Sequence, residues 1–311
     1  MASVVDSRTR RLTDAQWALI APLLPSNVGR RGHPFGDDRR VVDGIIYRFR
    51  TSTPWRDVPR GEFGPWQTIW KRHRRYAGDG TWDRVLQALL SQADVAGLID
   101  WDVSVDATIA RAHQHATNTT RPETRTQGAR SNHKNLRLDK VEPAGHGIGR
   151  SRGGLTTKIH HAVDGNGLPL AIVVTGGQRN DGAMLEQVLD DIRVPRIGGG
   201  RPRARPDAVL ADKAYGSGVN RRMLRARGIR VVIPEKSDQI ATRKRKGSKG
   251  GRPPAFDAEA YKDRNVVERS FALVKQWRGI ATRYDKLAIT YRSGAVLHAV
   301  LTWATLLGDT P

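Results

Sequence analysis

The spacing of apolar residues changes along this chain, and the change limits the folds that it can form. Up to about Gly97 the apolar residues recur every three or four positions, as Val41, Ile45 and Phe49 do, which predicts amphipathic helices. From Val103 to Ile109 they alternate with polar residues, which predicts a half-buried strand. Several strands in a row, followed by alternating helix and strand, indicate a mixed sheet flanked by helices. We therefore expect an α/β fold in residues 98–311, preceded by a helical N-terminal domain in residues 1–97.

Three helices are predicted in the N-terminal domain. Thr13-Asp14-Ala15-Gln16 has the form of a capping box at the start of the first helix, and the second carries the apolar positions from Val41 to Phe49. The third begins at Pro65, a favoured first helical position, and runs to Tyr76. Short helices that end in a basic, aromatic-rich segment suit a DNA-docking module of the helix-turn-helix type, and a solvated basic face on a helical bundle is the alternative. The candidate DNA contacts in this segment are Lys71, Arg72, Arg74 and Arg75.

The remaining elements are predicted from shorter patterns. Two strands, at 154–163 and 168–174, are joined by the turn Asp164-Gly165-Asn166-Gly167. Helices are expected at about 181–192, 220–227, 258–279 and 291–307, and strands at 208–212 and 229–233. The polar, basic stretch at about 113–152 is interpreted as an insertion. Residues from about 238 to 256 are interpreted as a mobile basic loop, because Thr242 to Pro254 contain no acid and cannot bury a core.

The charge of the chain indicates a polyanionic partner. Among its 311 residues are 53 Lys and Arg against 31 Asp and Glu, a net charge of +22, while 38% hydrophobic residues are too many for a disordered chain. Nucleic acid is therefore the first partner to consider, although ribosomal, chromatin and membrane-surface proteins carry charge of the same sign. The absence of cysteine excludes a disulfide scaffold and a thiolate zinc site. No run is apolar enough for a secretory signal or a membrane span, so we expect a soluble, intracellular protein.

Two aspartates occupy matching positions. Asp106 is expected at or near the end of a short strand that begins at Val103, and Asp212 ends the short strand that begins at Ala208. Sites form at strand ends in open α/β sheets, and two carboxylates brought together repel unless a cation such as Mg²⁺ lies between them. The alternative is that each is a turn or cap residue. Asp181 is a further candidate, for which a helix N-cap is the default reading.

A later helix presents a third acid. Tyr261, Arg264, Glu268 and Lys275 recur at offsets of 3, 7 and 14 residues, which places them within roughly 60° of one another on a helix. Such a helix can direct Glu268 at a metal while its cations face phosphates. The alternative is an exposed helix with an Arg264–Glu268 surface pair.

The histidines could suggest a metal site and the tryptophans base-stacking platforms, but their positions in the sequence favour neither. His160 and His161 are adjacent on a strand and point to opposite faces, which argues against joint metal ligation, so we expect them and the pair His113 and His115 at the surface or facing DNA. The eight Trp residues, most of them in the N-terminal domain, are expected to be core rather than stacking platforms.

These motifs resemble those of the DDE transposases of bacterial insertion sequences, in the insertion-sequence-five family. The likeness is carried by the Tyr261, Arg264, Glu268 and Lys275 spacing, by the sequences around Asp106 and Asp212, and by leader motifs such as Thr53-Pro54-Trp55-Arg56-Asp57-Val58-Pro59. The resemblance implies a ribonuclease-H-like fold, with the two Asp on strands and the Glu on a later helix. It also implies Mg²⁺ or Mn²⁺ as cofactor, as two ions held by Asp106, Asp212 and Glu268.

The same resemblance implies a reaction and its partners. Water cleaves a phosphodiester at the terminal inverted repeats of the element, and the freed 3′-OH then attacks a target strand. Tyr261 and Lys275 are expected to contact DNA near the cut, and Arg264 to position the helix or a phosphate. Further DNA contacts are expected in the basic loop, at Arg243, Lys244, Arg245 and Lys246. We expect a homo-oligomer assembled on DNA in the nucleoid of a bacterial cytoplasm.

Two other functions remain open on sequence grounds. One is a metal-dependent nuclease of the same fold that lacks strand transfer. The other is a basic DNA-binding protein without catalysis, in which the acids serve only as caps and ion-pair partners. The second differs from an enzyme in one respect, because its three acids have no reason to converge.

Overall fold

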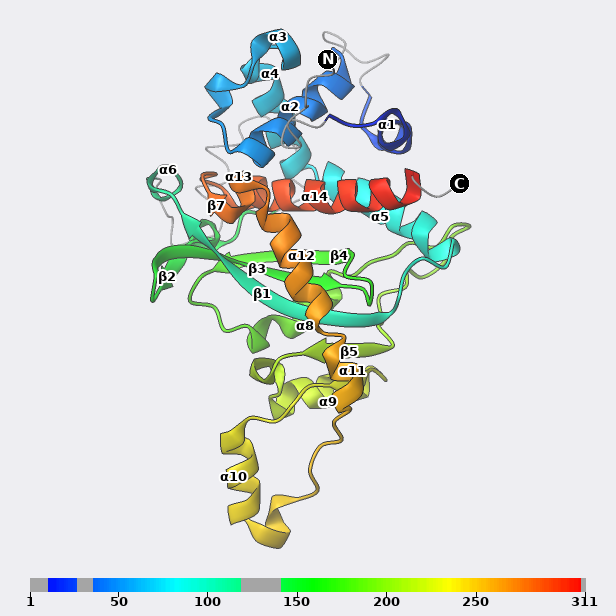
Figure 1. Ribbon diagram of the computed structural model, residues 1–311, viewed down its shortest axis with the longest axis vertical. Helices are drawn as coiled ribbons and strands as arrows, with labels where there is room; N and C mark the ends of the chain where they lie inside the picture. The colour runs from blue at the N-terminus through cyan, green and yellow to red at the C-terminus, as the bar shows by residue number, and fades with distance from the viewer. Residues whose placement is uncertain (1–10, 27–35, 119–140, 309–311) are drawn as a thin grey trace, which may run out of the picture.

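The structure is a computed structural model that describes residues 11–26, 36–118 and 141–308. It has three tiers along its long axis, with the N-terminal helices at one end, the sheet in the middle and a helical arm at the other end (Figure 1). Most of the predicted insertion at 113–152 lies outside the described residues. Its described residues are not all loop, because they include the short helix α6 (Gln114–Thr117), a 3-10 turn at Ala144–Gly147 and a strand at Gly149–Ser151.

The N-terminal helices agree with the predicted pattern. The described elements are α1 (Asp14–Ile20), η2 (Ala21–Leu23), α2 (Asp38–Thr51), η3 (Trp55–Asp57), α3 (Arg60–Phe63), α4 (Trp66–Gly78) and α5 (Thr81–Val95). The capping box is confirmed, because the Thr13 hydroxyl accepts from the Gln16 amide and the Gln16 side chain accepts from the Thr13 amide. The apolar residues of α2 from Val41 to Phe49 are buried as expected.

The sheet is built around one long strand. Its members are β1 (Asp102–Ala112), β2 (Gly149–Ser151), β3 (Gly154–Val163), β4 (Pro169–Gly176), β5 (Ala208–Ala211), β6 (Arg230–Val232) and β7 (Thr282–Arg283). β1 pairs antiparallel with β3 on one edge and parallel with β5 on the other. β4 and β2 continue the antiparallel side, and β6 continues the parallel side. The expected α/β fold with a mixed sheet is confirmed.

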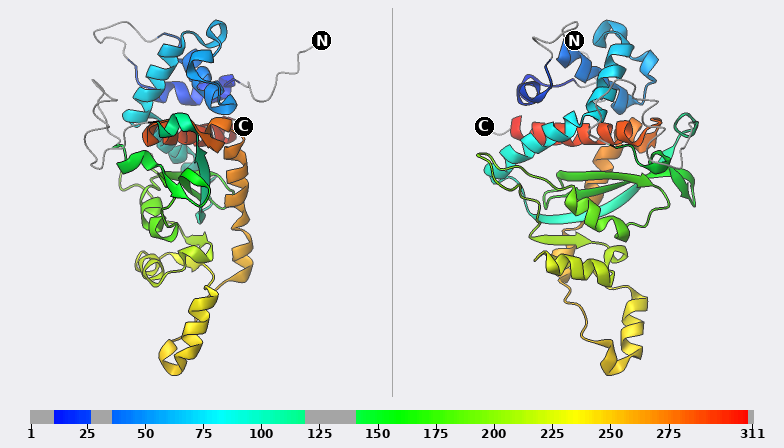
Figure 2. Two further views of the ribbon diagram at one scale, coloured as in Figure 1. Left: turned by 90° about the vertical axis from the view of Figure 1, so that its left-hand side faces the viewer. Right: turned by 180° about the vertical axis from the view of Figure 1, so that it is seen from behind.

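Helices cover both faces of this sheet. α12 (Asn265–Lys275) packs on β1 and β3, and α8 (Leu185–Asp190), which follows η5 (Gly182–Met184), packs on β3 and β4 from the opposite side (Figure 2). α9 (Gly218–Ala226), after η6 (Lys213–Tyr215), lies against β6. The long helix α14 (Ala288–Gly308) lies between the sheet and the N-terminal helices (Figure 1). One hydrophobic cluster joins the N-terminal helices, α14, and the sheet with the helices on its faces. The domain boundary near Gly97 stays a prediction.

The segment interpreted as a loop at 238–256 contains a helix. α10 (Ser237–Arg245) and η7 (Gly247–Gly250) form an arm that projects from the end of the molecule (Figure 1). The arm begins with the Gln239 side chain accepting from the Lys236 amide, and Arg243 forms an ion pair with Glu235. None of the α10 residues is buried, so the expectation that the segment lacks a core holds. The loop interpretation is wrong because helix hydrogen bonds are local and need no core.

The helix predicted at 258–279 is divided into three. α11 (Ala258–Lys262) and α12 are separated by two residues, and α13 (Arg278–Ala281) follows. At the first break the amides of Arg264 and Val267 bond to carbonyls three residues back, those of Tyr261 and Arg264. This is a tightened turn. Because Arg264 keeps helical backbone angles (φ −55°, ψ −22°), the chain keeps its direction through the turn.

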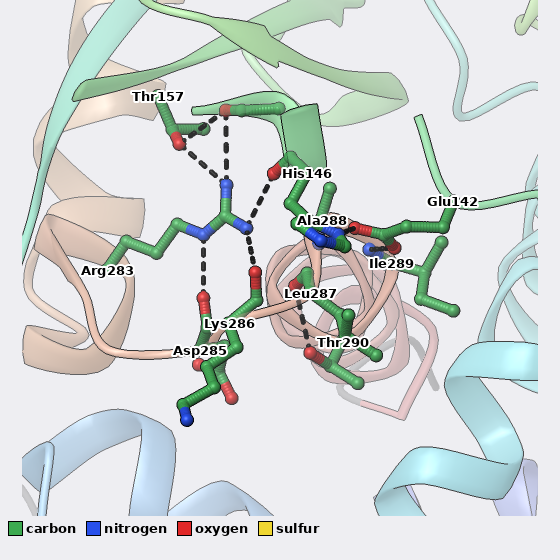
Figure 3. A network of polar contacts seen from close by, with 11 residues as sticks. Glu142, His146, Thr157, Arg283, Asp285, Lys286, Leu287, Ala288, Ile289 and Thr290 are labelled. Atoms are coloured by element: carbon green, nitrogen blue, oxygen red, sulfur yellow. Dashed lines mark hydrogen bonds and ion pairs between the residues drawn. The ribbon is translucent and has the colours of Figure 1, made fainter. Parts of the chain in front are cut away.

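A buried arginine joins three segments that are distant in sequence (Figure 3). Arg283, at the end of β7, is fully buried. Its five N–H donors are all used, and they reach Thr157 Oγ1 on β3 and the carbonyl oxygens of His146, Gly147, Asp285 and Lys286. The segment η4 (Ala144–Gly147) is thereby tied to the sheet and to the start of α14.

A buried carboxylate completes this network. The two carboxylate oxygens of Glu142 accept the amides of Ala288 and Ile289 at 2.6 and 3.0 Å, and one of them also lies 2.9 Å from His146 Nδ1. The amides at the start of a helix have no partner within the helix, and a negative charge there is favourable. Glu142 therefore caps α14.

We predict that Arg283→Met lowers the free energy of unfolding by about 3–5 kcal/mol, because four carbonyls and a hydroxyl lose a buried donor. Urea denaturation measures the change. The control is Arg11→Met, which removes an ion pair to Glu62 whose side chains are more than half exposed and should cost about 1 kcal/mol or less. Equal losses in the two variants would contradict the structural role of Arg283.

Candidate active site

Asp106 and Asp212 lie side by side: Asp106 is within β1, not at a strand end as expected, and Asp212 directly follows the neighbouring strand β5. The parallel register pairs Val105 with Ala211, so the next residue on each chain is one of the two aspartates, and adjacent strands are about 4.8 Å apart. Asp212 also caps a turn, since its carboxylate accepts the Ala214 amide at 2.7 Å. The cap reading is thus correct for Asp212, but it does not account for its position beside a second acid.

Arg264 connects this pair to the third predicted acid. One guanidinium nitrogen of Arg264 lies 2.5 Å from Asp106 Oδ2, and the other terminal nitrogen lies 3.0 Å from Glu268 Oε1. Arg264 is the N-cap residue of α12, and the buried side chains of Val267 and Phe271 on this helix hold it against the sheet. The start of α12 therefore brings Glu268 to the strand that carries Asp106.

The surroundings of Asp106 act on the pKa of its carboxyl in opposite directions. Burial raises the pKa of its carboxyl, the Ala107 amide and Arg264 lower it, and Asp212 raises it further. Glu268 is different, because 59% of its side chain is exposed. Within the described residues no three His, Cys, Asp or Glu side chains are close enough to hold a metal. Asp106 and Glu268 instead share one guanidinium.

The other two residues of the helical motif lie on either side of this point. Tyr261 is half-buried on α11, where its ring stands 5.3 Å from that of Phe256. Lys275 ends α12, seven residues after Glu268 and so about 10 Å farther along the helix. Burial lowers the pKa of Lys275. Within the motif, the side chains of Arg264 and Glu268 pair with each other, and that of Arg264 also pairs with Asp106.

The basic residues of α4 do not form one surface. Lys71 is exposed, and Arg75 lies 3.9 Å from Asp79. Arg74 lies over the Trp70 ring at 4.5 Å. Arg72 is buried, with Asp38 and Tyr76 as partners, because it lies on the face of α4 that packs inward. It is not available to a DNA backbone, contrary to the expectation for that residue.

The cations of the arm also differ in their exposure to solvent. Lys244, Arg245 and Lys246 are exposed. Arg243 is not, because only 18% of its side chain is accessible and it pairs with Glu235 at the base of the arm. The structure therefore gives Arg243 an anchoring position.

A fourth carboxylate, the further candidate Asp181, lies near the site. Asp181 makes no side-chain cap bond to the following helix. It accepts from Lys158 Nζ at 2.8 Å instead. Beside it, burial raises the pKa of Tyr215, and the carboxylates of Asp106, Asp181 and Asp212 raise it further.

The histidine pair is buried, so the expected surface position is wrong. His160 Nε2 lies 2.8 Å from Thr175 Oγ1, while the His161 ring lies 5.6 Å from Phe271 on α12. The two rings do point to opposite faces, as predicted. Burial lowers the pKa of His160 to about 4 and that of His161 to about 3. Both are neutral because their strand is covered by helices on both faces.

Comparison with known proteins agrees with this geometry. Residues 99–300 match the family described as "Transposase DDE domain", and residues 12–86 match "Putative transposase of IS4/5 family". The chain is 36% identical over 153 residues to "Putative transposase for insertion sequence element IS402" of Burkholderia cepacia, which covers 48% of this chain and 64% of that protein. It is 34% identical over 106 residues to "Uncharacterized protein y4sN" of Sinorhizobium fredii, covering 34% and 79%.

A solved structure with a weaker likeness is the pre-cleavage Mos1 transpososome. It is 11% identical with a TM-score of 0.25, over 91% of this chain and 83% of that chain, and a likeness of this size carries no argument. No helix in the described ranges is long and apolar enough to cross a bilayer. On the match over residues 99–300, the chain belongs to the DDE transposases of the IS4/5 group, which are enzymes of DNA phosphoryl transfer.

Proposed function

We propose that this protein cleaves DNA at the ends of an insertion sequence and joins the freed 3′-OH to target DNA, with Asp106, Asp212 and Glu268 as the metal ligands. The observation that supports this most is the pairing of Asp106 and Asp212 on adjacent strands, with Glu268 held to Asp106 through Arg264. A DNA-binding protein without catalysis gains nothing from two like charges in register at a half-buried position.

The donor set fits a hard divalent cation. Asp106 and Asp212 offer carboxylate oxygens, the ligands that Mg²⁺ and Mn²⁺ prefer, and the exposed side chain of Glu268 is free to turn toward them. When bound, a pair of such ions would stabilise charge on the attacking and leaving oxygens of the phosphodiester.

The chain's own residues would prepare this site. Arg264 balances the charge of Asp106 and Glu268 before a metal binds. With a metal on the carboxylates, its guanidinium would be available to a phosphate group, two oxygens of which it could bind with two parallel hydrogen bonds. Lys275, farther along α12, and Tyr261 on α11 would then contact the strand on either side of the cut. Cleavage and joining require two DNA segments, and we expect a homo-oligomer to hold the two element ends.

We predict that Glu268→Gln lowers Mg²⁺-dependent cleavage of a duplex carrying the native element end by more than about 100-fold, while binding in a gel shift is unchanged. The control is Glu259→Gln, an exposed acid on α11 paired with Lys262, which should cleave normally. Normal cleavage by Glu268→Gln would remove this residue from the site. Cleavage without joining in the wild type would identify a nuclease of the same fold.

We also predict that Arg264→Gln tightens Mn²⁺ binding to the DNA-free protein by about tenfold, because a positive charge between two ligands opposes a second cation. Titration followed by electron paramagnetic resonance of free Mn²⁺ measures the affinity. Arg269→Gln removes an exposed charge one turn later on the same helix and should change it less than twofold. Weaker Mn²⁺ binding by Arg264→Gln would show that Arg264 orients the carboxylates rather than competing with the metal.

A third prediction concerns the arm. Replacing Lys244, Arg245 and Lys246 by Gln should weaken DNA binding and reduce the slope of log K against log salt by up to about 3, since each phosphate contact contributes about 0.9. Fluorescence anisotropy at several salt concentrations measures the slope. Arg243→Gln alone should leave the slope nearly unchanged, because Arg243 is paired with Glu235. An unaltered slope in the triple variant would place the arm away from DNA.

A further inference from the structure

A cavity of about 770 Å³ opens where the N-terminal helices meet the end of β1. Three segments line it: the end of α2 with η3 and α4, the residues after β1, and the connection from β7 to α14. α6 and β7 lie at the same end of the sheet, next to the N-terminal helices (Figure 1). None of the predicted site residues except Arg74 takes part.

The walls of this cavity present aromatic rings. Trp55 and Trp70 line it from the N-terminal side, and both are half-buried rather than core as expected from the sequence. On the other side the rings of His113 and Tyr284 are 4.7 Å apart and tilted by 33°. Half-buried rings leave part of their faces open to a planar ligand.

Positive charge gathers at the rim and not in the floor. Arg74 lies over Trp70, and Lys286 is exposed. In the floor Arg48 is neutralised by Asp285 at 2.9 Å, and burial lowers the pKa of His73 to about 4, so that His73 is neutral. A planar apolar group suits the interior and an anionic group suits the rim.

We propose that this cavity binds one unpaired nucleotide of a DNA strand, with its base among the aromatic rings and its phosphate at Arg74 and Lys286. Base stacking on aromatic side chains beside cations is the general means of holding single-stranded nucleic acid. The volume suits a ligand of this size and not a double helix. The inference rests on the proposed function only in taking DNA as the source of the nucleotide.

The cavity is separate from the carboxylate site. His113 follows Asp106 by seven residues along one extended strand, which is about 23 Å at 3.3 Å per residue. The bound nucleotide therefore lies about seven nucleotides from the scissile bond if the strand keeps a spacing of 3.4 Å. The cavity can hold a strand open at a distance from the cut.

Octathymidylate provides a direct test, because it contains no element end and its binding needs no metal. The wild type should bind it, and Trp70→Leu should bind it at least about fivefold more weakly, as expected for one lost base–aromatic stack. The matched control is Trp66→Leu on the same helix, whose ring meets Arg56 and does not line the cavity. Fluorescence anisotropy of labelled octathymidylate gives the affinities, and failure of cleavage by the wild type would not affect them.

Two further measurements complete the experiment. Lys286→Gln changes only an exposed side chain, so it should fold normally and still weaken octathymidylate binding severalfold. Thymidine 5′-monophosphate should compete only at much higher concentration than the strand. The proposal is overturned if Trp70→Leu and Trp66→Leu bind within twofold of each other, if an eight-base-pair duplex binds as tightly as the single strand, or if the mononucleotide binds as tightly as octathymidylate.

Discussion

The pairing of β1 along both of its edges is the constraint on which the rest of the structure depends. β3 fixes one edge and β5 the other, with Asp106 opposite His161 on the antiparallel side and next to Asp212 on the parallel side. Since side chains alternate along a strand, a slip of one residue would move every one of them to the other face. The register therefore decides that Asp106 faces α12, and the direction of β1 decides that His113 lies at the far end, in the aromatic cavity.

Ion pairing with Arg264 reduces the repulsion between the acids that the fold brings together. Burial disfavours the ionised form of Asp106, and the Arg264 guanidinium opposes that effect. The same guanidinium binds Glu268, so a single cation pairs with two acids from different elements. A metal and an arginine compete for the same oxygens in such a site. If Asp106 and Glu268 held a metal, as proposed, Arg264 would be released from both carboxylates and available to DNA.

Local patterns identified most elements correctly, and their failures share a cause. The capping box at Thr13 and the strand pair joined at Asp164 depend on neighbouring residues, and both are present. The expectation of a loop around Arg243 failed because an exposed charged segment can satisfy its backbone by forming a helix. Arg72 and His160 were placed at the surface by residue type. Both are buried, because elements far away in the chain pack over them.

The sequence by itself determined which residues could carry the chemistry: two acids on or beside predicted strands, and a helix with Arg264 and Glu268 one turn apart. Their spacing is a local property, because helix and strand periods are fixed by the backbone. Only the tertiary structure decided that the two strands are adjacent, that Arg264 lies between Asp106 and Glu268, and that a fourth acid, Asp181, lies near them. Those outcomes depend on strand order, register and burial, which arise from contacts between residues far apart in the chain and leave no periodic trace in it.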